Sequence, residues 1–363
     1  MSSMLAIISA PRARAASYVI RSASLNGYVE LARSLGLNPP ALMRKVGLNV
    51  RCLDDPETPL SVYAAQHLLE ISAEAAGCED FGLQLARTRR MANLGPLSIV
   101  LREEPTARAA LDALCRYLRL LNASLLTHIE NHGDSVIIRE AFLTEREGSI
   151  RQSIELAVGV MYRILVELLG PAWRPRQVCF THRPPDDKRS HRALFGPHLD
   201  FNSSFNGIVC SARDLTARLP TVETGVALYA RRFLDQALAS TRSNTADAAR
   251  QLIVALLPGG RCTADQVAQH LGMDRRTLHR HLQVQSTTFT QLIQLVRSEF
   301  VVRQLRDSDR SMGELAELIG FSGSSAFAFW FRQRFGCTVS QWRKQHLPSA
   351  FPREVNQELL LRT

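Results

Sequence analysis

Arginine is the residue type in this sequence whose chemistry points most directly to a partner, because its planar fork of donors fits phosphate groups and the edge of guanine. The chain of 363 residues has a formal net charge of +10, and its only lysines are Lys45, Lys188 and Lys344. Between Arg242 and Gln345, fourteen basic residues stand against eight acidic ones, which gives +6 in less than a third of the chain. This distribution favours an anionic partner for the C-terminal part. The preference for arginine runs through the whole chain, however, and genomic base composition explains it equally well.

Two similar fragments near the C-terminus could position these side chains. In each fragment an alanine precedes a glycine by four residues; the pairs are Ala268 with Gly272, and Ala316 with Gly320. A small alanine allows a second helix to cross closely over the first, and a glycine with positive φ makes the turn between them. This spacing predicts two helix-turn-helix units. Two units in one stretch predict a protein that enters two grooves of DNA.

The second helix of each predicted unit begins after a polar residue and carries an apolar residue toward the core. The polar residues are Asp274 and Ser322, which we expect to cap their helices. The apolar residues are Leu278 and Phe327, which we expect to be buried against the first helix of the same unit.

Composition limits the class of protein. Apolar residues make up 45% of the chain and charged residues 21%, as in soluble globular proteins, and the length suits two domains. The seven cysteines are scattered without a C-x-x-C pair, which argues against a zinc ribbon or a disulfide scaffold and fits reduced thiols in a cytosol. The short apolar run at the N-terminus lacks a preceding basic region, and no run approaches the length of a membrane span. We therefore predict a cytoplasmic protein without a membrane partner.

The first 219 residues read as an α+β block. Periodic apolar residues predict helices over Tyr28–Leu35, Ser61–Ala75, Asp80–Arg87, Thr106–Leu121 and Ser149–Leu169. Strands are predicted at residues 125–130 and 135–142, on either side of a hairpin turn at 131–134, and shorter ones at 176–182, 198–201 and 206–211. A short helix is expected near residues 188–195.

Beyond a polar hinge at 239–245, every pattern is helical. The predicted helices are Thr245–Leu257, Thr263–Leu271, Arg275–Gln283, Phe289–Arg306, Ser311–Ile319, Ser325–Phe335 and Ser340–Gln345. The residues after Pro348 carry no clear signal.

The C-terminal stretch resembles the DNA-binding domain of AraC/XylS-type transcriptional regulators. The matching residues are Arg276–Leu282, Arg297–Leu305, Leu315–Ala316, Gly320–Ser322, Ser325, Phe327, Phe331, Gly336, Thr338 and Trp342–Arg343. Two positions depart from the family pattern: Phe329 replaces the usual arginine of the second recognition helix, and Val339 replaces the usual proline. Four N-terminal segments, at 54–60, 81–86, 93–111 and 178–185, are similar to the effector domain of one AraC subgroup.

The resemblance implies a division of the chain. It gives an α+β effector-binding and dimerisation domain over residues 1–224, then a linker helix and hinge over 225–244. An all-α DNA-binding domain with two helix-turn-helix units follows over 245–347, and a tail over 348–363. Each recognition helix is then expected in a major groove, one helical turn of DNA (about 34 Å) from the other, with the 289–306 helix holding that spacing.

The first recognition helix carries the residues that match base-facing positions of the family: Arg276, His279 and Arg280. Arginine can hold guanine with two hydrogen bonds, worth about 1–3 kcal/mol of discrimination. Three neighbours, Arg275, Thr277 and Arg297, are better suited to phosphate contact or to packing. For any single arginine the alternative is a solvated surface charge.

The second recognition helix lacks charge at the matching positions, which are Ser324, Ser325, Ala328 and Phe329. Phe329 could contact thymine methyl groups, or it could fold back among the neighbouring aromatic residues. Ser322 and Arg332 complete the predicted DNA-contacting set, and we expect this half to act mainly through phosphates.

The 149–169 helix is the candidate wall of an effector pocket, between the helix and the sheet. Ile154, Val158, Met161 and Leu165 recur at spacings of three and four and form one stripe. The alternative is that this stripe is plain core.

No motif for a nucleotide, a cofactor or a metal is present, and the histidines at 182, 191 and 198 are expected to be ordinary loop residues. We therefore predict no cofactor and no enzyme activity.

These patterns together favour a transcriptional regulator. We expect it to bind double-stranded promoter DNA and RNA polymerase, to act as an activator, to form a homodimer and to respond to an unidentified small-molecule effector. The alternative is a DNA-binding regulator whose N-terminal domain only dimerises and binds no ligand. An enzyme fused to a DNA-binding domain is a weaker alternative, because the sequence offers no catalytic motif.

Overall fold

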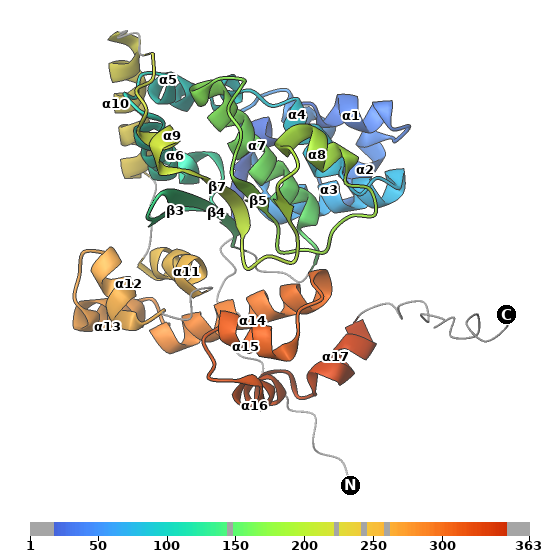
Figure 1. Ribbon diagram of the computed structural model, residues 1–363, viewed down its shortest axis with the longest axis vertical. Coiled ribbons are helices and arrows are strands. Elements are labelled where there is room, and N and C mark those ends of the chain that lie inside the picture. The colour runs from blue at the N-terminus through green and yellow to red at the C-terminus, as the bar shows by residue number, and fades with distance from the viewer. Residues whose placement is uncertain (1–17, 144–147, 221–224, 241–244, 258–261, 347–363) are drawn as a thin grey trace, which may run out of the picture.

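The computed structural model describes residues 18–143, 148–220, 225–240, 245–257 and 262–346 (Figure 1). A mixed α/β domain is followed by an entirely helical one, as the sequence predicts. In Figure 1 the α/β domain fills the upper part of the view and the helical domain the lower part. The predicted tail at 348–363, and most of the predicted hinge, lie outside the described residues.

The α/β domain begins with a small helical layer. Strands β1 (Val19–Arg21) and β2 (Pro59–Ser61) pair antiparallel beside the helices α1 (Tyr28–Ser34), α2 (Pro39–Lys45), α3 (Val62–Ala76) and α4 (Phe81–Arg87), with short 3-10 helices η1 (Ser22–Leu25), η2 (Val50–Leu53) and η3 (Met91–Leu94). The buried side chains of Tyr28, Leu68 and Phe81 form the centre of this layer. The predicted helices at 28–35, 61–75 and 80–87 are confirmed.

The strand pair β1–β2 and helix α2 were not predicted. The two prolines at the start of α2 obscured its helical pattern in the sequence. Proline nevertheless suits the first helical turn, where an amide hydrogen is not needed. The side chain of Asn38 caps this helix by accepting a hydrogen bond from the amide of Ala41 at 3.1 Å.

A five-stranded sheet forms the centre of the domain. Its order is β3 (Leu125–His132), β4 (Ser135–Phe142), β7 (Asn206–Ser211), β5 (Gln177–Cys179) and β6 (Leu199–Asp200), and only the β5–β6 pair is parallel. The predicted hairpin is confirmed, with His132 opposite Ser135. Helices α5 (Pro96–Arg102), α6 (Ala107–Leu121), α7 (Arg151–Leu169), α8 (Arg189–Phe195) and α9 (Ala212–Thr216) complete the domain.

The long helix α7 joins the sheet to the first helical layer. Its apolar side chains enter the main core with those of β4 and β7. On its other side α4 approaches so closely that a Cβ atom on Gly82 would lie 1.9 Å from the main-chain oxygen of Gln152. The side chain of Gln152 also accepts a hydrogen bond from the Gly82 amide at 2.8 Å. These contacts leave α7 little freedom to move independently of α4.

Helix α10 (Gly225–Ser240) lies along α5 and α6, at the upper left of Figure 1. The carboxylate of Asp235 accepts hydrogen bonds from Arg116 at 2.9 Å and from the hydroxyl of Tyr117 at 2.7 Å. The α10 helix continues to Ser240, so the first two residues of the predicted hinge belong to it.

The helical domain contains α11 (Thr245–Leu256), α12 (Ala264–His270), α13 (Arg275–Val284), α14 (Phe289–Asp307), α15 (Met312–Leu318), α16 (Ser324–Phe335) and α17 (Val339–His346). All seven predicted helices are confirmed within one or two residues at their ends. Gly272 and Gly320 make the turns with φ of 68° and 76°, and the alanines four residues earlier are buried. In the described residues no helix is long and apolar enough to cross a membrane.

Candidate functional site

Helix α13 begins with the predicted cap. The amide of Thr277 donates to Oδ1 of Asp274 at 2.8 Å, and the hydroxyl of Thr277 donates to Oδ2 at 3.1 Å. Leu278 and Leu282 are buried in the core of the helical domain. Because these two leucines fix one face of α13 inward, the opposite face must point to solvent.

The exposed face of α13 carries Arg275, Arg276, His279 and Arg280. Arg275 lies 3.5 Å from the carboxylate of Asp265, and both side chains are exposed, so this ion pair adds little stability. Among the described residues the other three make no ion pair, and their charges and donors remain available to a partner. The structure thus brings the predicted set together on one surface, with Thr277 half-buried at its edge.

The predicted residues of the second unit also gather on one surface. Ser322, Ser324, Ser325, Ala328, Phe329 and Arg332 are all exposed. Ser322 does not cap the helix as predicted: α16 begins at Ser324, the residue before it is Gly323, and no side chain caps it. The glycine lengthens the turn by one residue, which moves Ser322 out of the capping position.

Phe329 is 67% exposed, so it does not fold back among its aromatic neighbours. Those neighbours pack without it: the rings of Phe327 and Phe331 lie 5.9 Å apart, and Nε1 of Trp330 donates to the side chain of Gln294 at 2.6 Å. The second recognition surface is therefore apolar at its centre.

Helix α14 holds the second unit through Arg297. Its Nε donates to the main-chain oxygen of Ile319 at 3.1 Å, and its guanidinium lies 4.9 Å from the ring centre of Phe321. Of the two roles open to Arg297 from the sequence, these contacts correspond to packing against the α15–α16 turn. In Figure 1, α11 lies between the α/β domain and α13, and α14 lies between that domain and α16.

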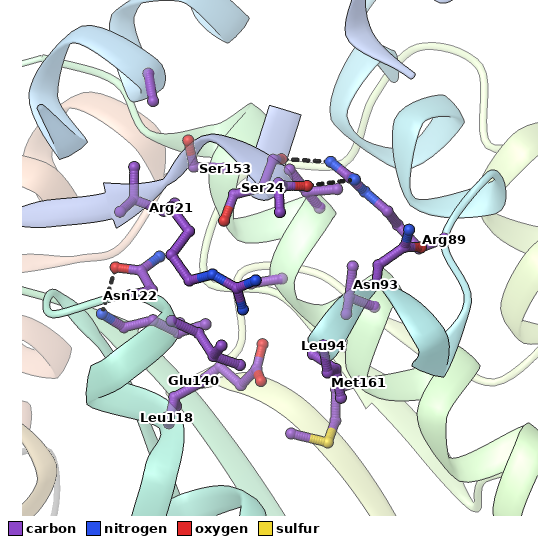
Figure 2. Close-up of a pocket in the computed structure, with 18 of the residues that line it drawn as sticks. Arg21, Ser24, Arg89, Asn93, Leu94, Leu118, Asn122, Glu140, Ser153 and Met161 are labelled. Carbon is purple, nitrogen blue, oxygen red and sulfur yellow. Dashed lines mark hydrogen bonds between the residues drawn. The ribbon is translucent and has the colours of Figure 1, made fainter. Parts of the chain in front are cut away.

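A cavity of about 150 Å³ lies inside the α/β domain. Its walls come from η1, α3, α6, α7 and the β3–β4 hairpin, and most of the lining is apolar (Figure 2). Met161, one of the four residues of the predicted stripe, lines it. Ile154, Val158 and Leu165 are buried in the main core instead. The face of α7 that meets the cavity is the adjacent one, with Ser153, Leu156, Ala157, Val160 and Ile164.

Several polar side chains enter this otherwise apolar cavity, and sequence reasoning missed them. Arg89 is buried and donates to the main-chain oxygens of Ala23 (2.9 Å) and Ser24. Arg21 reaches into the cavity above the carboxyl group of Glu140 (Figure 2). Burial raises the pKa of Glu140 to about 8, against a weak hydrogen bond from Thr127 at 3.4 Å that lowers it.

The signal for Glu140 was present in the strand pattern. The residues of β4 that face inward alternate along the strand: Val136, Ile138, Glu140 and Phe142 are all buried. Burying a carboxylate costs free energy, so a glutamate at an inward position of an alternating strand indicates a functional role. Arg21, by contrast, precedes any periodic segment and had no signal.

A second polar region joins the two domains. The main-chain amide of Arg183 donates to the oxygen of Asp307, the last residue of α14, at 2.8 Å. Its guanidinium donates to the oxygens of Arg306 (3.1 Å) and Ser308 (3.0 Å) and forms an ion pair with Asp309. Arg183 therefore clasps the end of α14.

Asn202 adds to this clasp with a backbone φ of 55°, which asparagine tolerates better than most residues. Its side-chain oxygen accepts from the amide of Asp309 at 3.3 Å, and its main-chain oxygen accepts from Arg310 at 2.7 Å. Burial raises the pKa of the nearby Asp307 carboxyl to about 6, although Arg303 and Arg306 lower it.

Two of the histidines expected to be loop residues are buried beside this clasp. The carboxylate of Glu155 on α7 lies 3.3 Å from Nε2 of His182 and 3.1 Å from Nε2 of His191. Burial lowers the pKa of His182 to about 4. The prediction of loop histidines is confirmed for His182, which lies outside any helix or strand, and is wrong for His191, which lies in α8. In the part of the chain that is described, no group of three or more His, Cys, Asp or Glu is placed to hold a metal ion.

Comparison with known families gives two matches. A family described as the arabinose-binding domain of AraC transcription regulator, N-terminal, matches residues 36–219. A family described as a helix-turn-helix domain matches residues 267–345. The first match covers the cavity helices and the sheet, and the second covers both recognition helices.

Curated relatives carry consistent names. The HTH-type transcriptional regulator VirS of Mycobacterium tuberculosis is 27% identical over 327 residues, which cover 90% of this chain and 96% of VirS. The transcriptional activator NphR of a Rhodococcus species is 32% identical over 84 residues, 23% of this chain and 25% of NphR. Among solved structures, the transcriptional regulator CdpR from Pseudomonas aeruginosa aligns over 88% of this chain and 96% of its own, at 19% identity and a TM-score of 0.44.

Proposed function

Because this chain belongs to the AraC family of transcription regulators, we propose that it binds promoter DNA through α13 and α16, activates transcription, and is controlled by a small molecule in its N-terminal cavity. That the chain is a DNA-binding regulator and not an enzyme follows from its two domains and its relatives. The DNA-contacting residues, the activator role and control by an effector are our proposals.

The observation that carries the DNA-binding proposal is the exposed face of α13. Arg276, His279 and Arg280 project from one side of a helix whose opposite side is held in the core by two leucines. A helix presented in this way can enter a major groove and offer its side chains to base edges. The exposed Arg275 and Arg332 supply contacts to phosphates beside the two helices.

The second recognition helix acts differently from the first. Its exposed face holds small polar residues around Phe329, which suits contact with thymine methyl groups more than hydrogen bonding to guanine. We propose that α13 supplies most of the sequence discrimination and that α16 adds affinity.

The cavity supports control by a small molecule over the alternative of a domain that only dimerises. It lies between the sheet and α7, is lined by elements of one domain, and combines apolar walls with a few polar groups. These are the properties of a ligand site. A domain that served only for assembly would have no need to keep a glutamate and an arginine buried in its interior.

The structure also offers a route from the cavity to the DNA-binding domain. Ser153 and Ala157 of α7 line the cavity, and the carboxylate of Glu155, between them, lies 3.3 Å from Nε2 of His182, the neighbour of Arg183. Arg183 in turn binds the end of α14, the helix that connects the two helix-turn-helix units. A ligand that favours one position of α7 would shift the position of α14 by its differential affinity for the two arrangements. The covalent route through residues 225–239 runs in parallel.

Activation requires contact with RNA polymerase, and the name of NphR, an activator, supports this role. We also propose a homodimer formed through α10. One face of this helix exposes Val226, Tyr229 and Phe233, spaced by three and four residues, and Leu228 beside them. Their exposed fractions are 55%, 71%, 60% and 53%, respectively. A stripe of this kind on a two-fold axis would bury itself against its own copy.

The proposal is tested by identifying the bound promoter through genomic pull-down and rebuilding its regulation with RNA polymerase in vitro. A Met161→Trp variant should fill the cavity, keep DNA binding and lose the response to the effector. Met161→Leu, which preserves volume, is the matched control and should respond normally. A stable Met161→Trp protein that still responds fully would exclude the cavity as the effector site.

A further inference from the structure

Three of the polar side chains that line the cavity carry a buried atom whose hydrogen-bonding capacity is unused among the described residues. Nε of Arg21, Nε2 of Gln66 and Oε2 of Glu140 are buried, line the cavity and have no hydrogen-bond partner among the described residues. Gln66 is 8% exposed and Glu140 is 4% exposed. A buried polar atom without a partner costs about 1–3 kcal/mol. Three such atoms around one cavity indicate that a ligand completes their hydrogen bonds.

All three groups act as donors at neutral pH. The guanidinium of Arg21 and the amide nitrogen of Gln66 can only donate. Burial raises the pKa of Glu140 to about 8, so its carboxyl group is mostly protonated at pH 7 and its free oxygen carries the proton. The hydroxyl of Thr127 binds the other oxygen. The ligand must therefore bring acceptor atoms.

The charge around the cavity is positive. The only hydrogen bonds described for the Arg89 guanidinium go to main-chain oxygens, and no carboxylate among the described residues pairs with it. Burial lowers its pKa to about 10, so it stays charged at neutral pH. Arg21 pairs with Glu57, whose side chain is exposed to water. Arg21 lies above the neutral carboxyl group of Glu140, and the charged Arg89 belongs to the same lining, so the cavity favours an anion and opposes an ammonium ion.

The remaining wall sets the size and character of the ligand. Leu118, Phe142 and Met161 belong to an apolar lining around about 150 Å³. An apolar cavity of that volume holds a molecule about as large as benzene.

We propose that the cavity binds a small monocarboxylic acid with a compact apolar body, either an aromatic acid or a short-chain fatty acid. The carboxylate accepts hydrogen bonds from Arg21, Gln66 and Glu140, and the apolar body lies against Leu118, Phe142 and Met161. This inference rests on the proposed function, because it names the chemistry of the effector in that same cavity.

The test measures binding of four compact probes to the full-length protein by isothermal titration calorimetry. The probes are benzoate, hexanoate, benzyl alcohol and benzylamine. We expect at least one carboxylate to bind about tenfold more tightly than benzyl alcohol, a difference of ~1.4 kcal/mol. Benzylamine should not bind. The ranking of benzoate against hexanoate separates an aromatic source from an aliphatic one.

Two cavity variants and one control test the assigned residues. Arg21→Met and Gln66→Leu should each weaken carboxylate binding by about tenfold and leave the affinity for benzyl alcohol unchanged. Arg87→Met alters an exposed arginine two residues from Arg89 and should bind like the wild-type chain. Since Arg21 also pairs with Glu57, Gln66→Leu decides the matter if Arg21→Met does not fold.

The outcomes separate this inference from the proposed function. Equal affinity for benzoate and benzyl alcohol, or a preference for benzylamine, would overturn the carboxylate assignment and leave the cavity as a ligand site. Binding by none of the four also overturns it. In that case the Met161→Trp variant decides about the function: loss of the effector response keeps the cavity as the site of another ligand, and a full response removes it.

Discussion

Individual side chains determine how we expect this regulator to discriminate between DNA sequences. Arg280 lies on the exposed face of α13 with its donors free of any ion pair in the described residues, whereas Phe329 at the centre of α16 can offer only apolar contact. Bidentate hydrogen bonds discriminate between base pairs more sharply than contact with a methyl group. The two halves of the binding site should therefore differ in stringency.

We predict that Arg280→Ala relaxes the preference at one base pair by about 1–3 kcal/mol, while Phe329→Ala relaxes it less. Selection of binding sites from a randomised pool with each variant measures the change. Ser340→Ala, an exposed substitution outside both recognition helices, is the control. A second half-site more stringent than the first would contradict the prediction.

The buried Glu140 makes stability depend on pH. Burial raises its pKa from 4.5 to about 8, so the folded chain binds a proton more tightly than the unfolded chain. Its contribution is fully present below about pH 4.5 and is lost as the pH rises through 8. Relative to the wild-type chain, Glu140→Gln should gain on the order of a few kcal/mol between pH 5 and pH 8.5. Urea unfolding at both pH values measures it, and a difference independent of pH would count against the assignment.

Two helices, α14 and α10, carry the contacts on which the proposed control and the proposed dimer depend. Arg183 and Asn202, from loops of the α/β domain, bind the end of α14. Helix α14 therefore both connects the two helix-turn-helix units and contacts the α/β domain. Helix α10 packs one face on α5 and α6, and its opposite face is exposed, where a second copy of the chain could bind.

Arg183→Ala removes two hydrogen bonds and an ion pair at the domain boundary. Because the side chain is partly exposed, we expect docking to weaken by only about 1–2 kcal/mol. Hydrogen exchange at residues 306–310 should become faster while the recognition helices keep their protection. Arg192→Ala, an exposed arginine on α8, is the matched control. Unchanged exchange would show that the clasp does not hold α14.

Phe233→Asp should weaken dimerisation by at least about tenfold, because a buried aromatic residue at the centre of an interface is often a dominant contact. Sedimentation equilibrium over a range of concentrations measures the dissociation constant. Gln269→Glu makes a comparable change at an exposed residue of α12, away from α10, and is the control. A chain that is monomeric without the substitution, or an equally stable variant dimer, would rule out α10 as the interface.

At the scale of the whole molecule, we expect the excess of basic residues in the C-terminal part to determine much of the affinity for DNA. The +6 charge between Arg242 and Gln345 is carried mainly by arginines, several of them exposed on the two recognition helices. Neutralised phosphates release counterions, so affinity falls steeply with salt.

If six to ten phosphates are engaged, the affinity of the full chain for its promoter should fall about 10³–10⁵-fold from ~50 to ~200 mM salt. Gel-shift titration at several salt concentrations gives the slope. Arg332→Gln should make the slope shallower by about one phosphate. An affinity independent of salt would contradict the electrostatic basis of the proposal.

The order of elements could be predicted from the sequence because each has a local cause. The alanine and glycine spacing determines both helix-turn-helix units, and alternating apolar residues determine the β3–β4 hairpin. Local patterns did not predict α2, because prolines stand at its start. They did not predict the β1–β2 pair either, because its two strands lie far apart in the sequence and pair only in the folded chain.

The cavity and the contact between the domains were decided by tertiary structure alone. The sequence places Met161 on an apolar stripe of α7, but only the packing of α3, η1 and the sheet against that helix shows which face meets the cavity. Arg21, Gln66 and Glu140 lie far apart in the chain and come together because β1, α3 and β4 meet around α7. Periodicity is a property of one element, whereas a cavity forms where the side chains of several packed elements leave space between them.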